Sequence, residues 1–172
     1  MRRALAATAL AVGMLAAFDA GAKDMNGRLG VGGARTLAGV GGLDLVYWAG
    51  KLALNGTFQI EYSSPEVGDS DLVLRLAAGA LFPIVSGERA ELSFGGRVNL
   101  SAGSGTQISL EAPLRLEWYV NDWFALHGEV GVVIDIVPED GRVFGSGPSN
   151  KGFGFTIGAT QVTGGGGFLV IF

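Results

Sequence analysis

Cysteine is absent from the 172-residue chain, and histidine and proline are scarce, at one and five residues. The lack of cysteine excludes a disulfide framework and a lipid-modified N-terminal cysteine. No phosphate-binding loop, zinc-ligand spacing or nucleotide fingerprint occurs. Glycine, by contrast, accounts for 30 residues, which is too many for a helical protein. Most of these glycines stand inside alternating segments, as in strands that bend or pack closely in a narrow barrel.

The first 22 residues have the pattern of a secretory signal peptide. Arg2 and Arg3 precede an apolar stretch from Ala4 to Phe18, and small residues follow up to Ala22. A membrane anchor is the alternative, but the apolar run is shorter than the roughly 18 residues needed to span a bilayer. We expect cleavage after Ala22 and a single mature domain of residues 23–172.

The mature chain is acidic. Removing residues 1–22 takes away two arginines and one aspartate, which leaves 10 basic and 15 acidic side chains and a net charge of −5. Because an acidic surface repels the phosphate backbone, we expect no nucleic-acid partner.

Apolar side chains recur at every second position of the mature chain, and no helical stripe is evident. In residues 52–62, Leu54, Phe58 and Ile60 share one face, whereas Asn55 and Gln59 share the other. The same alternation predicts strands over 71–82, 90–100, 108–120 and 124–136. Weaker strands are expected around 28–35 and 43–50, and a last one over 155–172. The sequence therefore predicts an all-β chain of eight strands.

The last predicted strand changes parity along its length. Its apolar residues are odd-numbered at Phe153 and Phe155 but even-numbered at Phe168 and Val170. A parity change implies a bulge, which we place at Gly164–Gly167.

A soluble sandwich also alternates, so loop lengths and aromatic positions are needed to identify the apolar face. Short connections ("AGKL", "IVSGER", "VNDW") follow the even strands, and long ones such as "PEDGRVFGSGPSNKG" follow odd strands. Seven aromatic residues flank the short turns: Tyr47, Trp48, Phe82, Trp118, Tyr119, Trp123 and Phe124. These features predict an aromatic girdle on an antiparallel transmembrane up-and-down β-barrel, with the longest loop, Val137–Gly152, outside.

The chain ends in "FLVIF", with apolar residues at alternate positions before a terminal phenylalanine. In this respect it resembles the small bacterial outer-membrane β-barrels, the eight-stranded group that includes the OmpA membrane domain and OmpX. The resemblance implies that Phe168, Val170 and Phe172 form the signal that the outer-membrane assembly machinery recognises, although the family often has tyrosine where Val170 stands. It also implies a closed, lipid-contacting barrel in the bacterial outer membrane.

An eight-stranded barrel is just wide enough for its own side chains to fill it. Charged residues on the inward face must then be paired. We expect an interior ion network made of Arg75, Arg97, Glu111, Arg115, Glu117, His127 and Glu129. A tight connection near Gly103–Gly105 sets Arg97 opposite Glu111. This pattern favours a filled interior over a proton or solute path.

Catalysis on this scaffold would need a nucleophile beside an oriented base. His127 has Glu129 on its own face but no serine or threonine at that spacing. The acidic clusters Asp69–Asp71 and Pro138–Asp140 could hold a divalent cation loosely, but as solvated turns they need no ligand. We expect no enzymatic activity, no metal and no cofactor.

The working hypothesis is a monomeric, surface-exposed outer-membrane protein with a structural or interaction role and a partner for its outer loops. Three alternatives stay open: a lipid-modifying enzyme, a narrow pore, and a soluble periplasmic barrel that binds an apolar ligand. Membrane fractionation separates the last of these from the others.

The terminal phenylalanine leads to a first prediction. Deleting Phe172 removes burial worth at most about 1.5–3 kcal/mol, so the truncated chain should still refold from urea in detergent micelles. It should nevertheless accumulate poorly in the outer membrane, because the end of the proposed assembly signal is lost. Quantifying both proteins in outer-membrane fractions tests this, and equal amounts would contradict the assembly-signal interpretation.

Overall fold

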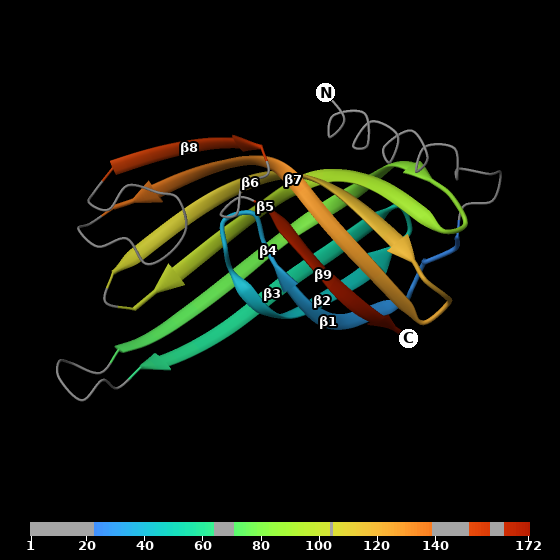
Figure 1. The fold of residues 1–172 in the computed structure, drawn as a ribbon, viewed down its shortest axis with the longest axis horizontal. Coiled ribbons are helices and arrows are strands. Elements are labelled where there is room, and N and C mark those ends of the chain that lie inside the picture. Colours follow the sequence, from blue (N-terminus) through green and yellow to red (C-terminus); the bar gives the residue numbers. More distant parts are fainter. Residues whose placement is uncertain (1–22, 64–70, 104, 139–151, 159–163) are drawn as a thin grey trace, which may run out of the picture.

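The alternating segments form antiparallel strands arranged as a barrel (Figure 1). The computed structural model describes residues 23–63, 71–103, 105–138, 152–158 and 164–172. The strands in these ranges are Leu29–Arg35 (β1), Gly41–Ala49 (β2), Leu52–Ser63 (β3), Asp71–Ser86 (β4), Ala90–Ala102 (β5), Thr106–Tyr119 (β6), Phe124–Val137 (β7), Gly152–Gly158 (β8) and Gly165–Ile171 (β9). Within that part of the chain, no helix is long and apolar enough to cross a membrane.

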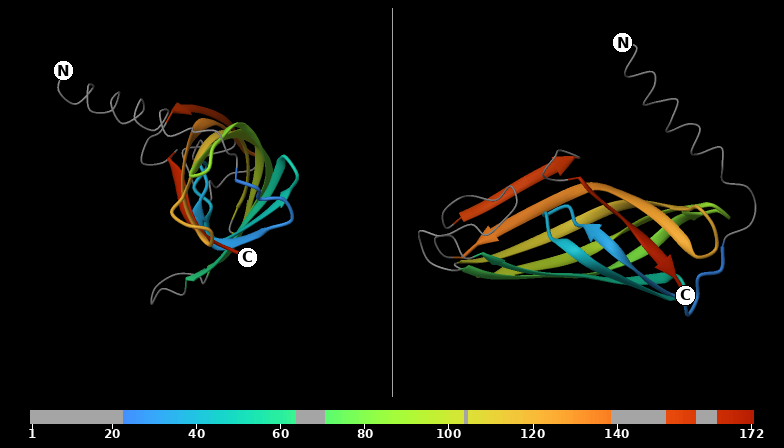
Figure 2. Two further views of the ribbon diagram at one scale, coloured as in Figure 1. Left: turned by 90° about the vertical axis from the view of Figure 1, so that its right-hand side faces the viewer. Right: turned by 60° about the horizontal axis from the view of Figure 1, so that its bottom comes forward.

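The sheet closes on itself because the first and last strands pair. β1 to β7 pair in sequence order, β7 pairs with β9, and β9 pairs with β1. β8 and β9 lie along the same neighbour: β8 pairs with Gly131–Val137 and β9 with Phe124–Glu129. They therefore occupy one position in the ring, which makes an eight-stranded barrel. Figure 2 shows the ring from its end. The predicted all-β class, antiparallel order and number of strands are confirmed.

The last strand differs in detail from the prediction. The sequence predicts one bulged strand over 155–172, whereas the structure has two strands, β8 and β9. Phe155 of β8 and Phe168 of β9 both face outward, so the change of parity is real. It falls between Gly158 and Gly165, on the N-terminal side of the predicted bulge. The two pieces keep their apolar faces outward because each is paired separately with β7.

The two ends of the barrel are different. The terminal end carries the first described residues, Phe172, and the short turns after β2, β4 and β6. The first of these turns contains Gly50, whose φ of 63° is one that glycine adopts readily. The opposite end, called the loop end below, carries the connections after β3, β5 and β7. The connections after β3 and β7 are longer than the terminal-end turns, as predicted, whereas the connection between β5 and β6 spans only residues 103–105.

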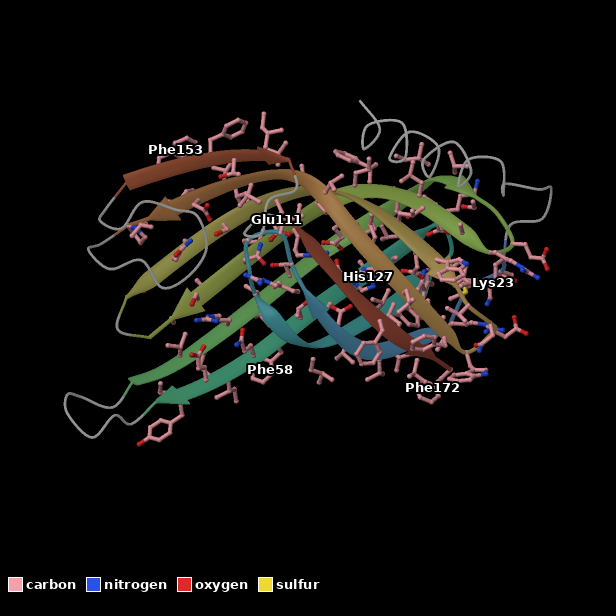
Figure 3. The ribbon with its side chains drawn as sticks, viewed as in Figure 1. Lys23, Phe58, Glu111, His127, Phe153 and Phe172 are labelled. Carbon is pink, nitrogen blue, oxygen red and sulfur yellow. The ribbon has the colours of Figure 1, made fainter. Side chains whose placement is uncertain are left out.

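Apolar side chains cover the outside of the barrel. Phe153 projects away from the strands, whereas Glu111 and His127 lie within the outline of the barrel (Figure 3). Every long strand contributes large exposed apolar residues, among them Leu54, Phe58, Ile60, Leu72, Leu74, Leu76, Phe94, Val98, Leu100, Leu110, Leu114, Val130 and Ile136. Most inward positions on the same strands are polar or small, with exceptions such as Leu81 and Tyr119. The barrel thus has the reverse polarity of a water-soluble domain.

The turn between β1 and β2, Thr36–Val40, folds into the barrel. Leu37, Ala38 and Val40 are almost completely buried and form an apolar cluster with Ala77 of β4 and Val133 of β7. β1 and β2 have 7 and 9 residues, whereas β3 to β7 have 12 to 16, so this turn lies partway along the barrel wall. This inward turn was not predicted from the sequence.

Several predictions from the sequence concern residues outside the described ranges. These are the signal peptide at residues 1–22, most of the acidic segments Asp69–Asp71 and Pro138–Asp140, and the greater part of the loop Val137–Gly152. They stay predictions.

Two glycines of the wall give a matched pair for testing strand packing. A Cβ added to Gly95 would come within 2.0 Å of the Ala80 carbonyl oxygen, whereas one added to Gly128 would meet nothing within 4 Å. We expect Gly95→Ala to destabilise the barrel by about 1–3 kcal/mol and Gly128→Ala to leave its stability unchanged or slightly higher. Urea unfolding in detergent measures both. Equal stability of the two variants would show that the backbone contact at Gly95 is not tight.

Candidate functional site

The centre of the barrel holds two buried arginines among carboxylates. Arg97 of β5 lies opposite Glu111 of β6, in the predicted register. Its guanidinium contacts a Glu111 oxygen at 2.8 Å and the two oxygens of Glu129, from β7, at 2.7 and 2.9 Å. Asn55 of β3, oriented by its hydrogen-bond partners, accepts from Arg97 Nε at 3.1 Å. Arg97 therefore joins four elements of the wall through one planar group.

The second arginine, Arg115 of β6, lies nearer the terminal end. Its guanidinium contacts Glu117 at 3.0 Å and Glu129 at 3.8 Å. His127 Nδ1 lies 2.7 Å from Arg115 Nη2. Since a guanidinium can only donate, Nδ1 accepts this hydrogen bond. Glu129 thus connects the two arginines into one cluster.

Six of the seven predicted network residues come together in this cluster: Arg97, Glu111, Arg115, Glu117, His127 and Glu129. All six are buried. Two guanidinium groups and three carboxylates nearly balance their charges, as a narrow interior of low polarity requires. The cluster can hold the strands in register, because each strand contributes a charge that needs a partner on another strand.

Arg75 corrects the prediction, because it lies outside the cluster. It contacts Glu61 at 3.2 Å and Gln59 at 3.3 Å, both on β3. On β4, the neighbour of Arg97 is Gly79, four residues from Arg75. That separation is about 13 Å along a strand, so Arg75 belongs to a different layer, nearer the loop end. Alternation places a residue on the inward face but does not tell its height along the barrel.

Two further groups of buried polar residues line the lumen. Asp135 of β7 accepts from Ser109 at 2.5 Å and from Gln107 at 3.2 Å, both on β6. Asp44 of β2 accepts from Thr57 of β3 at 2.8 Å. The inward face is therefore polar along much of its length.

The inward turn is tied to the central cluster, a contact that the sequence reading missed. The Ala38 N–H donates to Glu111 Oε1 at 2.6 Å, and the Thr36 hydroxyl contacts Asn99 Oδ1 at 3.1 Å. Glu111 therefore bonds the turn through one oxygen and Arg97 through the other. The available signal was "TLAGVGG", a connection with three apolar residues where a solvent-exposed loop would be polar.

The seven aromatic residues of the predicted girdle divide between the two faces. Tyr47, Phe82, Trp118 and Trp123 are exposed on the outside at the terminal end, and Phe124 is partly exposed there. Trp48 and Tyr119 contradict the prediction, because they point inward and are buried at 4% and 2% exposure. Each directly follows an outward aromatic, and successive side chains of a strand point to opposite faces.

The two inward aromatics belong to an apolar cluster that fills the terminal end of the lumen. Its members are Met25, Val46, Trp48, Ala53, Leu81, Tyr119, Ala125, Leu169 and Ile171. Leu169 and Ile171, which interrupt the polar alternation of the last strand in the sequence, are therefore inward packing residues. Beside the cluster, Lys23 Nζ donates to the Asn121 carbonyl at 3.0 Å and lies 3.3 Å from Asp122. These contacts hold Lys23 against the turn between β6 and β7 at the terminal end.

The three residues of the proposed assembly signal lie at the seam. Phe168 and Phe172 are exposed on the outside, and Val170 is partly exposed. The Phe172 N–H donates to the Leu29 carbonyl at 2.9 Å, and the Leu29 N–H donates back at 3.3 Å. The last residue thus completes the pairing of β9 with β1.

The lumen does not contain a recognisable catalytic arrangement among the described residues. His127 bonds Arg115 rather than a carboxylate, and no serine or threonine hydroxyl is bonded to it there. Within the same ranges, no group of three or more His, Cys, Asp or Glu residues could hold a metal ion. Comparison of the chain with protein-family models, curated proteins and solved structures finds no match. Any functional conclusion therefore rests on the fold and on the geometry of the lumen.

The central cluster generates a prediction on coupling. Because Arg97 and Glu111 are both buried, removing one deprives the other of a charged partner. Without Arg97, Glu111 keeps the Ala38 N–H, and without Glu111, Arg97 keeps Glu129. We expect Arg97→Ala and Glu111→Ala each to lower the free energy of unfolding by about 3–5 kcal/mol, and the double variant to cost less than the sum. Urea unfolding in detergent measures this cycle.

The pair Arg75 and Glu61 serves as the control, because Glu61 is half exposed. Its coupling should be at most about 1 kcal/mol. Strict additivity at Arg97 and Glu111, or an equally large coupling at the control pair, would contradict the role given to the central cluster.

Proposed function

We propose that the chain is a bacterial outer-membrane β-barrel with a side-chain-filled lumen, acting as a structural or surface-interaction protein. Its partners are the lipids of the membrane and, during biogenesis, the outer-membrane assembly machinery. It acts as a monomer and exposes the loop end at the cell surface, where a loop partner binds. No catalytic step is part of the proposal, because His127 has no bonded nucleophile among the described residues.

The reversed polarity of the barrel is the observation that carries this proposal. In water, exposed rows of Leu, Phe, Ile and Val on every long strand would drive aggregation. In a bilayer the same surface is favourable, and the polar lumen is shielded from lipid. Closure of the ring also leaves no free edge along β1 and β9, as a bilayer requires.

Three features support the outer membrane and the orientation. The expected signal peptide directs export, and "FLVIF" resembles the assembly signal of small outer-membrane barrels. Tyr47, Phe82, Trp118 and Trp123 form an exposed aromatic group at the terminal end, which suits a membrane interface. Short turns and both ends of the mature chain lie at that end, as in barrels whose short turns face the periplasm.

The filled lumen favours a structural role over transport. The central ion cluster, the inward turn and the apolar cluster at the terminal end follow one another along the lumen. The residues of each are buried and are held by ion pairs, hydrogen bonds or apolar packing. A solute path would have to disrupt all three.

A charge placed on the outer surface tests the membrane location. Leu76 is half exposed near the middle of β4, and Ala102 is exposed at the loop end of β5. In lipid vesicles we expect Leu76→Arg to cost about 2–4 kcal/mol of unfolding free energy and Ala102→Arg about 0–1 kcal/mol, because the penalty depends on depth in the bilayer. Urea unfolding of the folded, vesicle-embedded variants provides the measurement.

A soluble barrel would tolerate both arginines within about 0.5 kcal/mol. That outcome, together with recovery of the protein in the soluble periplasmic fraction, would refute the membrane proposal. Steady ion currents from the purified protein in planar bilayers would instead refute the filled lumen and favour the narrow pore.

A further inference from the structure

The inward turn Thr36–Val40 fills a space that the barrel wall itself leaves empty. The wall residues that face it are small: Ala77, Val133 and Gly131. A Cβ added to Gly131 would meet the Ala112 carbonyl oxygen at 2.2 Å and Leu37 Cδ1 at 3.0 Å, so Leu37 of the turn packs directly against the backbone of the wall. The lumen at this height is therefore closed by the turn and not by the strands.

The hydrogen bonds of the turn are mostly internal. The Thr36 N–H donates to the Val40 carbonyl at 2.8 Å, and the Gly39 N–H donates to the Thr36 carbonyl at 3.1 Å. The Val40 N–H also donates to the Thr36 hydroxyl at 3.2 Å. The turn keeps these bonds in any position, because all their atoms move with it.

Only two hydrogen bonds of the described residues tie the turn to the lumen wall, from Ala38 to Glu111 and from Thr36 to Asn99. The Ala38–Glu111 contact is the shorter and involves a carboxylate. Next to the turn lie Gly41 and Gly42 of β2, which pair with Arg35 and Ala34, and the Gly41 N–H donates to Gln59 Oε1 at 3.2 Å. As glycines they can absorb a change of backbone direction. The turn is thus a self-contained unit with glycines on one side and a single charge-assisted attachment.

We propose that Thr36–Val40 is a displaceable stopper of the loop-end half of the lumen and that Glu111 is its latch. Breaking the Ala38–Glu111 hydrogen bond lets the turn swing out and exposes the apolar pocket lined by Ala77 and Val133. The displaced state opens a blind pocket and not a channel, since the central ion cluster and the apolar cluster of the terminal end still close the lumen. Displacement of the turn is therefore compatible with the proposed function, because the lumen stays closed, and it adds a movable element to the barrel.

Cysteine accessibility can test the displacement, because the native chain has no cysteine. Leu37→Cys reports on the stopper, and Ala125→Cys, equally buried in the apolar cluster of the terminal end, reports on opening of the whole barrel. Both are refolded in detergent and treated with a small hydrophilic methanethiosulfonate. We expect Leu37→Cys to react at least ten times faster than Ala125→Cys. If Leu37→Cys does not fold, Val40→Cys is used in its place.

The latch is tested by adding Glu111→Gln to each reporter. Ala38 and Arg97 donate to different oxygens of Glu111, and a glutamine side chain has one oxygen, so in this geometry one of the two donors faces the NH2 group. Glu111→Gln should therefore raise the reaction rate at Leu37→Cys several-fold and leave that at Ala125→Cys unchanged. Glu117→Gln is the matched control, since it removes a buried carboxylate of the same cluster that bonds Arg115 and not the turn.

Two results would contradict the stopper, and one would contradict the latch. Equal rates at the two reporters mean that the turn is released only when the barrel unfolds, and absence of any reaction at Leu37→Cys means that it is a permanent plug. Either result overturns the stopper. An equal effect of Glu117→Gln and Glu111→Gln on Leu37→Cys overturns the latch.

Discussion

The structure depends on the pairing of buried charges in a lumen too narrow to hydrate them. Arg97 and Arg115 are surrounded by Glu111, Glu117 and Glu129, and every member comes from a wall strand. A charge in such a place is costly unless a partner meets it at hydrogen-bond distance. The register of β5, β6 and β7 is therefore constrained from inside, because a shift by two residues would separate the pairs while still keeping every side chain on its proper face.

The polar lumen and the apolar exterior are consequences of one another in a closed barrel. Strand alternation sends every second residue inward, so the charges that occupy the lumen leave the apolar residues on the outside. Pairing of β9 with β1 joins the two ends of the ring and satisfies the backbone groups along that seam. On the proposed function, lipid completes this arrangement by covering the outer surface, and the aromatic residues of the terminal end mark its boundary.

The lumen is filled by three structures of different chemistry. The terminal end is closed by an apolar cluster around Trp48 and Tyr119, the centre by the ion cluster, and the loop-end side by the turn after β1. Glu111 belongs to two of them, because its oxygens bond Arg97 and Ala38 separately. Glu111 thus connects the inward turn to the ion cluster.

The sequence by itself determined the all-β class, the eight positions of the ring, the inward or outward face of most strand residues and the opposition of Arg97 and Glu111. These follow from a period of two and from short connections, which are local properties. Tertiary structure alone decided that Trp48 and Tyr119 pack into one apolar cluster at the terminal end, that Arg75 lies outside the ion cluster, and that Thr36–Val40 enters the lumen. Those outcomes depend on the height of each residue along the barrel and on the space left by the opposite wall, which strand tilt and stagger set only when the ring closes.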